Sequence, residues 1–164
     1  MKDPLRNDVK KWINEARNAK LIVRLISGDH VETAKAVAFK SGILKQEDMR
    51  NNYSVLEADE FRALVGSIEQ KYDDNEQLTY EIEKKDAFRE IAKSLRVLAK
   101  ATAHDKHLLV VGLRTLESGN GSLKHVTVTG EGINDLDALK ASNVGLSMGT
   151  GCSAAKEEAD IILT

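Results

Sequence analysis

The chain has 164 residues, of which 41% are hydrophobic and 30% are charged, and its formal net charge at pH 7 is −2. This length fits one domain with a hydrophobic core, or two small lobes. The nearly balanced charge gives no indication of disorder or of nucleic-acid binding. The single cysteine, Cys152, excludes an internal disulfide and suits a reducing compartment. No apolar run approaches the roughly 18 residues that a helix needs to span a bilayer.

Helices and strands alternate in the first part of the chain. Apolar residues recur at helical spacing from Val9 to Ala16 and predict a helix, in which Trp12 is expected to anchor a core. The almost continuous apolar run 21–26 then predicts a central parallel strand. A second helix follows at residues 31–39 and is expected to end at a glycine C-cap. This alternation predicts an α/β fold with a Rossmann-like parallel sheet flanked by helices.

Residues 45–85 interrupt the alternation and are interpreted as a surface insertion. Within it, residues 53–56 are a candidate short strand and Asp59 is a candidate helix cap. The polar segment 67–77, with acidic residues at 73–75, is expected to form a solvated loop or hairpin.

Regular elements return after the insertion, and the loops between them carry polar residues. Lys106 falls in the first turn of a helix opened by Thr102, where a cation opposes the helix dipole. This unfavourable placement fits an anion to be bound, and a solvated lysine explains it equally well. The predicted elements are a helix at 87–94, a strand at 96–99, a turn at 118–122, a strand at 125–128, a helix from Asn134 or Asp135, strands at 144–148 and 161–163, and a helix at 153–159.

The stretch from His125 to Asp137 is the strongest candidate for a site. A strand, a glycine turn and a helix in that order place Glu131, Asn134 and Asp135 at the C-terminal edge of a parallel sheet, where ligands bind in open α/β folds. Carboxylates beside glycines suit Mg²⁺ with a phosphate. An ordinary loop whose acids cap the next helix explains the same residues equally well.

The loops together resemble the later sequence motifs of the haloacid-dehalogenase superfamily, and within it the phosphorylation domain of P-type cation pumps. Those pumps carry D-P-P-R, T-G-D, a lysine after a polar turn, and T-G-D-G-x-N-D. The corresponding segments here are D-P-L-R, S-G-D, H-D-K and T-G-E-G-I-N-D. The segment L-E-A-D-E-F-R-A-L-V, which precedes L-R-V-L-A-K, is most similar to the corresponding sequence of plasma-membrane-type calcium pumps.

The resemblance implies a role for each polar residue of the loops. Ser27 and Asn134 would contact the phosphoryl group, Lys106 would neutralise its charge, and Glu131 with Asp135 would hold Mg²⁺ and support the loop. ATP in the intact pump would lie near the remaining three residues, Gly28, Asp29 and Lys100.

The chain departs from the family pattern at several of these positions. Serine at Ser27 keeps the hydroxyl of the family's threonine, whereas lysine at Lys100 stands where many members have arginine. Glu131 replaces the metal-binding aspartate, and its extra methylene displaces the carboxylate by about one carbon–carbon bond, which exceeds the roughly 0.5 Å tolerance of such sites.

The phosphorylated aspartate of the family lies in D-K-T-G-T, and these 164 residues do not contain that sequence. The chain is therefore interpreted as a partial phosphorylation domain, 1–164, lacking the nucleophile strand, from the cytoplasmic part of an integral membrane pump. Its expected partners are the nucleotide-binding, actuator and membrane domains, and alone it is predicted to be inactive. The alternatives are a non-catalytic regulatory module derived from a pump and a degenerate soluble phosphatase of the superfamily.

The absence of that strand also affects the sheet. Strands 21–26 and 125–128 would flank it in the family fold, and unpaired apolar edges favour aggregation. In a stable monomer these two strands are therefore expected to pair directly with each other. The alternative is that a segment from another copy of the chain fills the gap between them.

Overall fold

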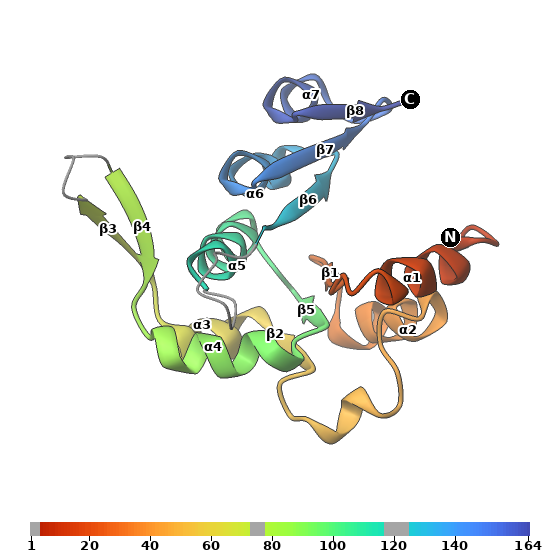
Figure 1. Ribbon diagram of the computed structural model, residues 1–164, viewed down its shortest axis with the longest axis horizontal. Coiled ribbons are helices and arrows are strands. Elements are labelled where there is room, and N and C mark those ends of the chain that lie inside the picture. Colours follow the sequence, from red (N-terminus) through yellow and green to blue (C-terminus); the bar gives the residue numbers. More distant parts are fainter. Residues whose placement is uncertain (1–3, 73–77, 117–124) are drawn as a thin grey trace. The chain divides into compact units, whose positions relative to one another are not determined.

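The computed structural model describes residues 4–72, 78–116 and 125–164, and the chain divides into two compact units (Figure 1). The first unit comprises Met1–Phe61 and Glu90–Ala101, and the second comprises Arg62–Arg89 and Thr102–Thr164. The acidic residues 73–75 and the turn at 118–122, both predicted from the sequence, lie outside the described residues. Each unit is described below by itself.

The first unit contains a three-stranded parallel sheet in the order β1–β5–β2. Its core lies between this sheet and α2, where Ala34 and Ala38 pack near Val97 and Ala99 of the central strand. Alanines on the helix let it approach the sheet closely, and all four residues are almost completely buried. The elements of this unit are α1 (Val9–Asn18), β1 (Leu25–Ile26), α2 (Val31–Ser41), the 3-10 turn η1 (Asp48–Arg50), β2 (Val55–Glu57) and β5 (Val97–Ala99).

The second unit contains another three-stranded parallel sheet, β6–β7–β8, and an antiparallel hairpin, β3–β4. Helices α6 and α7 lie on β6 and β7, and α5 packs on α6 (Figure 1). Gly112 of α5 lies against the ring of Phe88, so closely that a Cβ there would collide with it. The elements are β3 (Ile68–Tyr72), β4 (Leu78–Ile82), α5 (Ala103–Thr115), β6 (Thr127–Gly130), η2 (Ile133–Asp135), α6 (Leu136–Ala141), β7 (Val144–Met148), α7 (Ser153–Glu158) and β8 (Ile161–Leu163), while α3 (Ala58–Val65) and α4 (Lys85–Ser94) each contribute to both units.

The predicted α/β class with parallel sheets flanked by helices is confirmed. Within the described residues, β1 pairs with β5 in the sheet of the first unit, and β6 pairs with β7 in the sheet of the second. The expected direct pairing of β1 with β6 would join strands of different units, and it stays a prediction.

Two expectations about the N-terminal region are corrected. The apolar run 21–26 forms a strand only at Leu25–Ile26, while Leu21 and Ile22 are 62% and 51% exposed. The partner strand β5 has only three residues, so the ladder cannot extend back along the run. Trp12 is not a core anchor, since it is 59% exposed, donates a hydrogen bond to Asp8, and lies beside the Lys11 ammonium.

The assignment of residues 45–85 as an insertion stays a prediction. Within that range, β2 belongs to the sheet of the first unit, whereas β3 and β4 form the expected hairpin in the second. Among the described helices, none combines the length and apolar composition that crossing a bilayer requires.

Candidate functional site

The loop that follows β1 is closed by a reciprocal contact between a hydroxyl and an acid. The Ser27 hydroxyl donates to Asp29 Oδ2 at 2.9 Å, and the Asp29 backbone N–H donates to Ser27 Oγ at 3.1 Å. Gly28, between them, is exposed and leaves the backbone open to approach. The hydroxyl proton of Ser27 is thus held by Asp29, and its oxygen already accepts one hydrogen bond.

The loop that follows β5 is tied to the Ser27 loop through the backbone. The Lys100 N–H donates to the Asp29 carbonyl and the Ala101 N–H donates to the Ser27 carbonyl, both at 2.9 Å. Lys100 has a left-handed backbone, with φ of 52°. Its ammonium lies 2.8 Å from Glu57 Oε2, and this hydrogen bond raises the pKa of Lys100. The structure therefore places Ser27, Asp29 and Lys100 together at the C-terminal end of one parallel sheet.

In the second unit, the contact that organises the site is the ion pair of Lys106 with Asp135. Lys106 Nζ lies 2.6 Å from Asp135 Oδ1, and each side chain is 18% exposed. The other oxygen, Oδ2, accepts hydrogen bonds from the Glu131 and Gly132 backbone N–H groups, both at 3.1 Å. Burial alone would raise the pKa of Asp135, but the hydrogen bonds from Lys106, Gly132 and Glu131 hold it below its ordinary value. Asp135 thus fixes both the lysine and the glycine turn.

The glycine turn depends on close approach of backbone to the same aspartate. A Cβ built on Gly130 would lie 2.5 Å from Asp135 Cβ, so only glycine fits this position without displacement. The turn exposes the side chains of Glu131 and Asn134, and neither has a side-chain hydrogen bond within the described residues. Their polar atoms are available to a ligand.

A feature that the sequence analysis did not identify fixes the start of α5, the helix that carries Lys106. Asp105 is completely buried and accepts hydrogen bonds from the Thr102 N–H at 2.8 Å and the Thr102 hydroxyl at 2.7 Å. It also accepts from Arg62 Nη1 at 2.7 Å. The Thr102-x-x-Asp105 spacing resembles a capping box and would have indicated the cap, but the Arg62 contact spans 43 residues and leaves no local signal.

A magnesium ion needs one or two carboxylates together with water and phosphate oxygens. Glu131 supplies one exposed carboxylate that has no protein partner in the described part of the chain, whereas both oxygens of Asp135 are already bonded to Lys106 or to backbone N–H groups. No cluster of three or more His, Cys, Asp or Glu side chains suited to a metal occurs among the described residues. The donor set therefore fits a magnesium ion completed by a phosphate, and does not form a site closed by protein ligands alone.

The predicted site residues fall into two groups, one in each unit. Ser27, Gly28, Asp29 and Lys100 belong to the first unit, and Lys106, Glu131, Asn134 and Asp135 belong to the second. Contacts within each group are as described above. The roles assigned to these residues from the family resemblance stay predictions.

Comparison with known proteins gives the family of this chain. Plasma membrane calcium-transporting ATPase 4 of Bos taurus is 40% identical over 166 aligned residues, which cover 100% of this chain and 12% of that protein. Calcium-transporting ATPase 2 of Saccharomyces cerevisiae is 38% identical, with 99% of this chain and 12% of that protein covered. The chain is homologous to a segment of the calcium-transporting P-type ATPases. No protein-family model matches it.

Solved structures agree with this assignment at the level of the fold. The catalytic domain of the CPx-ATPase CopB-B superposes with a TM-score of 0.59 at 20% identity, covering 99% of this chain and 42% of that structure. A zinc-transporting PIB-type ATPase in its E2.Pi state gives a TM-score of 0.54 at 21% identity, covering 97% and 17% respectively. The predicted resemblance to P-type pumps is therefore confirmed, and the chain spans about an eighth of the length of its calcium-pump relatives.

The lowered pKa of Asp135 makes the stability of this chain depend on pH in the acid range. A carboxyl group whose pKa is lower in the folded state contributes stability above its unfolded pKa of about 3.9, and loses it as the pH falls through the folded value. Asp135→Asn is therefore expected to be less stable than the wild type at pH 7 and to lose less stability between pH 5 and pH 3. Urea unfolding at each pH measures both effects.

Asp86→Asn serves as the control, because the Asp86 side chain is 94% exposed and makes only a surface ion pair with Arg89. It should follow the wild-type pH dependence. An Asp135→Asn chain whose stability falls as steeply below pH 4 as that of the wild type would contradict this role of the ion pair.

Proposed function

We propose that this chain supplies the phosphate- and magnesium-binding loops of the phosphoryl-transfer domain of an ATP-driven calcium pump. The observation that supports it most is the Lys106–Asp135 ion pair, which holds the Glu131–Gly132 turn in a chain homologous over its full length to calcium-transporting ATPases. The pump as a whole would also comprise nucleotide-binding, actuator and membrane domains, and this segment would lie on its cytoplasmic side.

Each loop side chain has a chemistry that suits one part of this task. The Lys106 ammonium has three N–H donors, and those that do not contact Asp135 could donate to phosphoryl oxygens. The exposed Asn134 amide and the Ser27 hydroxyl are hydrogen-bond donors for phosphoryl oxygens, provided that Ser27 exchanges its bond to Asp29. Magnesium, when bound, would neutralise charge on the transferring phosphoryl group.

The protein's own contribution is positioning. The amides of Glu131 and Gly132 are turned to Asp135, so the turn is held rigid before any ligand binds. The phosphoryl group itself would be accepted by an aspartate, and the 164 residues contain no D-K-T-G-T sequence to provide it. In this proposal the segment binds and stabilises a phosphoryl group that another part of the pump carries.

Glu131→Asp is expected to strengthen magnesium binding in the presence of inorganic phosphate, on the order of tenfold. The shorter side chain brings the carboxylate back by one carbon–carbon bond, toward the distance that the family's aspartate provides. Calorimetric titration of the chain with MgCl₂, with and without inorganic phosphate, measures the change.

The matched control is Glu157→Asp, a change of the same kind at an exposed position on α7. It should leave the titration unchanged, whereas Lys106→Gln should abolish the effect of phosphate on magnesium affinity. Equal magnesium affinities for the Glu131→Asp and wild-type chains would count against Glu131 as a magnesium ligand, and a phosphate effect that survives Lys106→Gln would count against the site.

A further inference from the structure

The first unit has a pocket of about 400 Å³ on the side of its sheet away from the Ser27 and Lys100 loops. Val23 and Arg96 line it and precede strands β1 and β5, whereas Ser27 and Lys100 follow these strands. Because β1 and β5 run parallel, the pocket and the loops lie at opposite ends of the strands. The pocket is therefore separate from the proposed phosphoryl-transfer loops, and its size is in the range of small-ligand sites.

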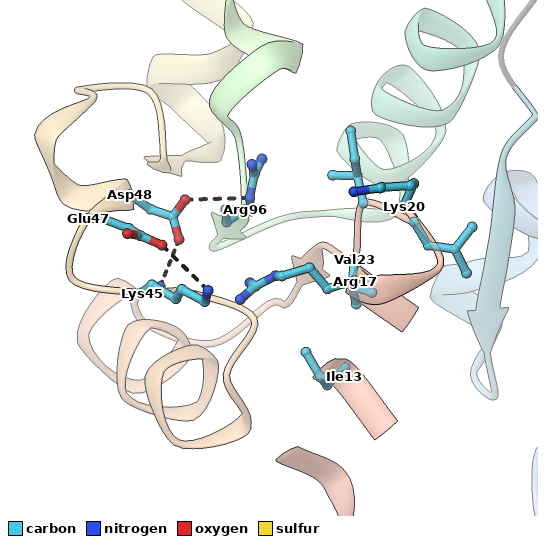
Figure 2. Close-up of a pocket in the computed structure, with 10 residues that line it drawn as sticks. Ile13, Arg17, Lys20, Val23, Lys45, Glu47, Asp48 and Arg96 are labelled. Atoms are coloured by element: carbon cyan, nitrogen blue, oxygen red, sulfur yellow. Dashed lines mark hydrogen bonds and ion pairs between the residues drawn. The ribbon is translucent and has the colours of Figure 1, made fainter. Parts of the chain in front are cut away.

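Positive charge exceeds negative charge in the pocket. Its lining includes four cationic side chains and two acidic ones, Glu47 and Asp48. Figure 2 shows these side chains together. Glu47 lies 3.5 Å from Lys45 Nζ, and Asp48 lies 3.8 Å from Arg96 Nε. Each of the two acidic side chains is therefore already paired with a cation. The remaining cations, Arg17 and Lys20, have no acidic partner among the described residues.

Arg17 is held in place with part of its guanidinium unpaired. Its Nη2 donates to the Gly42 carbonyl at 3.0 Å and to the Ile43 carbonyl at 3.2 Å. Its Nη1 is buried and has no hydrogen-bond partner in the described part of the chain. A buried charged donor without an acceptor is unfavourable, and an anion in the pocket would remove that deficit.

Lys20 occupies a backbone position that normally favours glycine. It follows the last residues of α1 with φ of 64°, and the Leu21 N–H donates to the Ala16 carbonyl at 3.0 Å, as in a helix end closed by a left-handed residue. A lysine there is strained, whereas glycine would not be. The strained residue is also a pocket-lining cation, and Figure 2 draws its side chain along the pocket wall.

A fifth cation of this unit, Arg24, adjoins the lining residue Val23 in the sequence. Burial, and then the charge of Arg96, lower the pKa of Arg24 to about 10. The guanidinium of Arg24 donates to the Ala92 carbonyl at 2.7 Å and has no acidic partner in the described residues. The apolar part of the lining includes Leu21 and Ile22, which are more than half exposed.

We propose that this pocket binds a small organic phosphate, with the phosphate on Arg17 and Lys20 and the apolar part of the ligand against Leu21 and Ile22. Guanidinium and ammonium groups bind phosphate by charge-assisted hydrogen bonds, and arginine matches its geometry in a bidentate way. The exposed apolar side chains would contact the organic part of the ligand. An organic phosphate is therefore expected to bind more tightly than free inorganic phosphate.

The test is a titration of the ¹⁵N-labelled chain with phenyl phosphate in magnesium-free buffer, followed by amide chemical shifts. We expect shifts centred on residues 17–23 and 45–48, and weaker binding of inorganic phosphate. Lys20→Gly is expected to weaken phenyl phosphate binding about tenfold, as the loss of one charged hydrogen-bond donor predicts. The same substitution should leave the melting temperature unchanged or raise it, so lost affinity cannot be ascribed to unfolding.

Two control variants separate the pocket from the other features of the chain. Lys40→Gln removes an exposed cation of the same unit that does not line the pocket, and Lys106→Gln removes the lysine of the phosphoryl-transfer loops. Neither should change the affinity for phenyl phosphate, so the outcome is independent of the proposed function. Equal affinities of the Lys20→Gly and Lys40→Gln chains, shifts centred on the loops around Lys106, or equally tight binding of phenol would each overturn the proposal.

Discussion

We expect Asp105→Ala to lower the free energy of unfolding by about 3 kcal/mol, the largest loss of stability among the substitutions discussed. The carboxylate is fully buried and accepts hydrogen bonds from the Thr102 N–H, the Thr102 hydroxyl and Arg62. Its removal breaks the reciprocal half of the capping box at the start of α5 and leaves these three donors without their acceptor, while Thr102 Oγ1 still accepts from the backbone N–H of residue 105. The Arg62 side chain is 42% exposed and can reach water, which limits the loss. Urea unfolding monitored by circular dichroism measures it.

Arg62→Ala is the companion variant and is expected to cost less, about 1 kcal/mol, because Asp105 keeps both of its bonds to Thr102. The double variant should be only slightly less stable than Asp105→Ala alone, since the ion pair is already lost. Additive effects of the two substitutions would show that Arg62 and Asp105 do not interact, and would contradict this account of the helix start.

Gly130→Ala is expected to disrupt the candidate site directly and to reduce phosphoryl transfer by more than tenfold in an intact pump. The added Cβ would lie 2.5 Å from Asp135 Cβ, and neither atom can rotate away because both are fixed to the backbone. Asp135 must shift, and its 2.6 Å contact with Lys106 must change with it. The stability cost is about 1–3 kcal/mol, as for other overpacked sites.

Gly132→Ala provides a matched control two residues away. A Cβ there would lie 3.7 Å from Asp135 Oδ2, an ordinary contact, and Gly132 has a φ of −114° that alanine also adopts. This variant should keep near-wild-type stability and phosphoryl transfer. If Gly130→Ala and Gly132→Ala behave alike, the close approach at Gly130 is not what positions Asp135.

Strands and helices with strong local patterns could be predicted from the sequence. The β7 and β8 boundaries, Val144–Met148 and Ile161–Leu163, agree with the prediction, as does the C-cap at Gly42, whose φ is 82°. In these segments the local preference and the tertiary environment favour the same conformation. The strand predicted at 21–26 was too long, because strand length depends on the partner β5 and not on the apolar run itself.

The candidate site could be predicted only in part. Residue types and their order identified Lys106, Glu131 and Asp135, because these lie in short segments with recognisable spacing. The bond from Lys106 to Asp135 joins residues 29 apart, and its length and the two backbone N–H groups that share the carboxylate are properties of the folded chain. The pocket near Arg17 could not be predicted either, because its residues come from three separate segments, 13–23, 45–48 and 96.

The most direct test of the proposed function is to replace the homologous segment of human plasma membrane calcium-transporting ATPase 4, which is 40% identical over 166 residues, with this chain. The measurement is the calcium-dependent incorporation of γ-phosphate from labelled ATP into the chimeric pump as an acid-stable, hydroxylamine-sensitive phosphoenzyme. The account predicts incorporation by the chimera, its loss by more than tenfold on Lys106→Ala, and unchanged incorporation on Lys40→Gln. A correctly folded chimera that forms no phosphoenzyme, or one whose phosphoenzyme is insensitive to Lys106→Ala, would contradict the assignment of these loops to phosphoryl transfer.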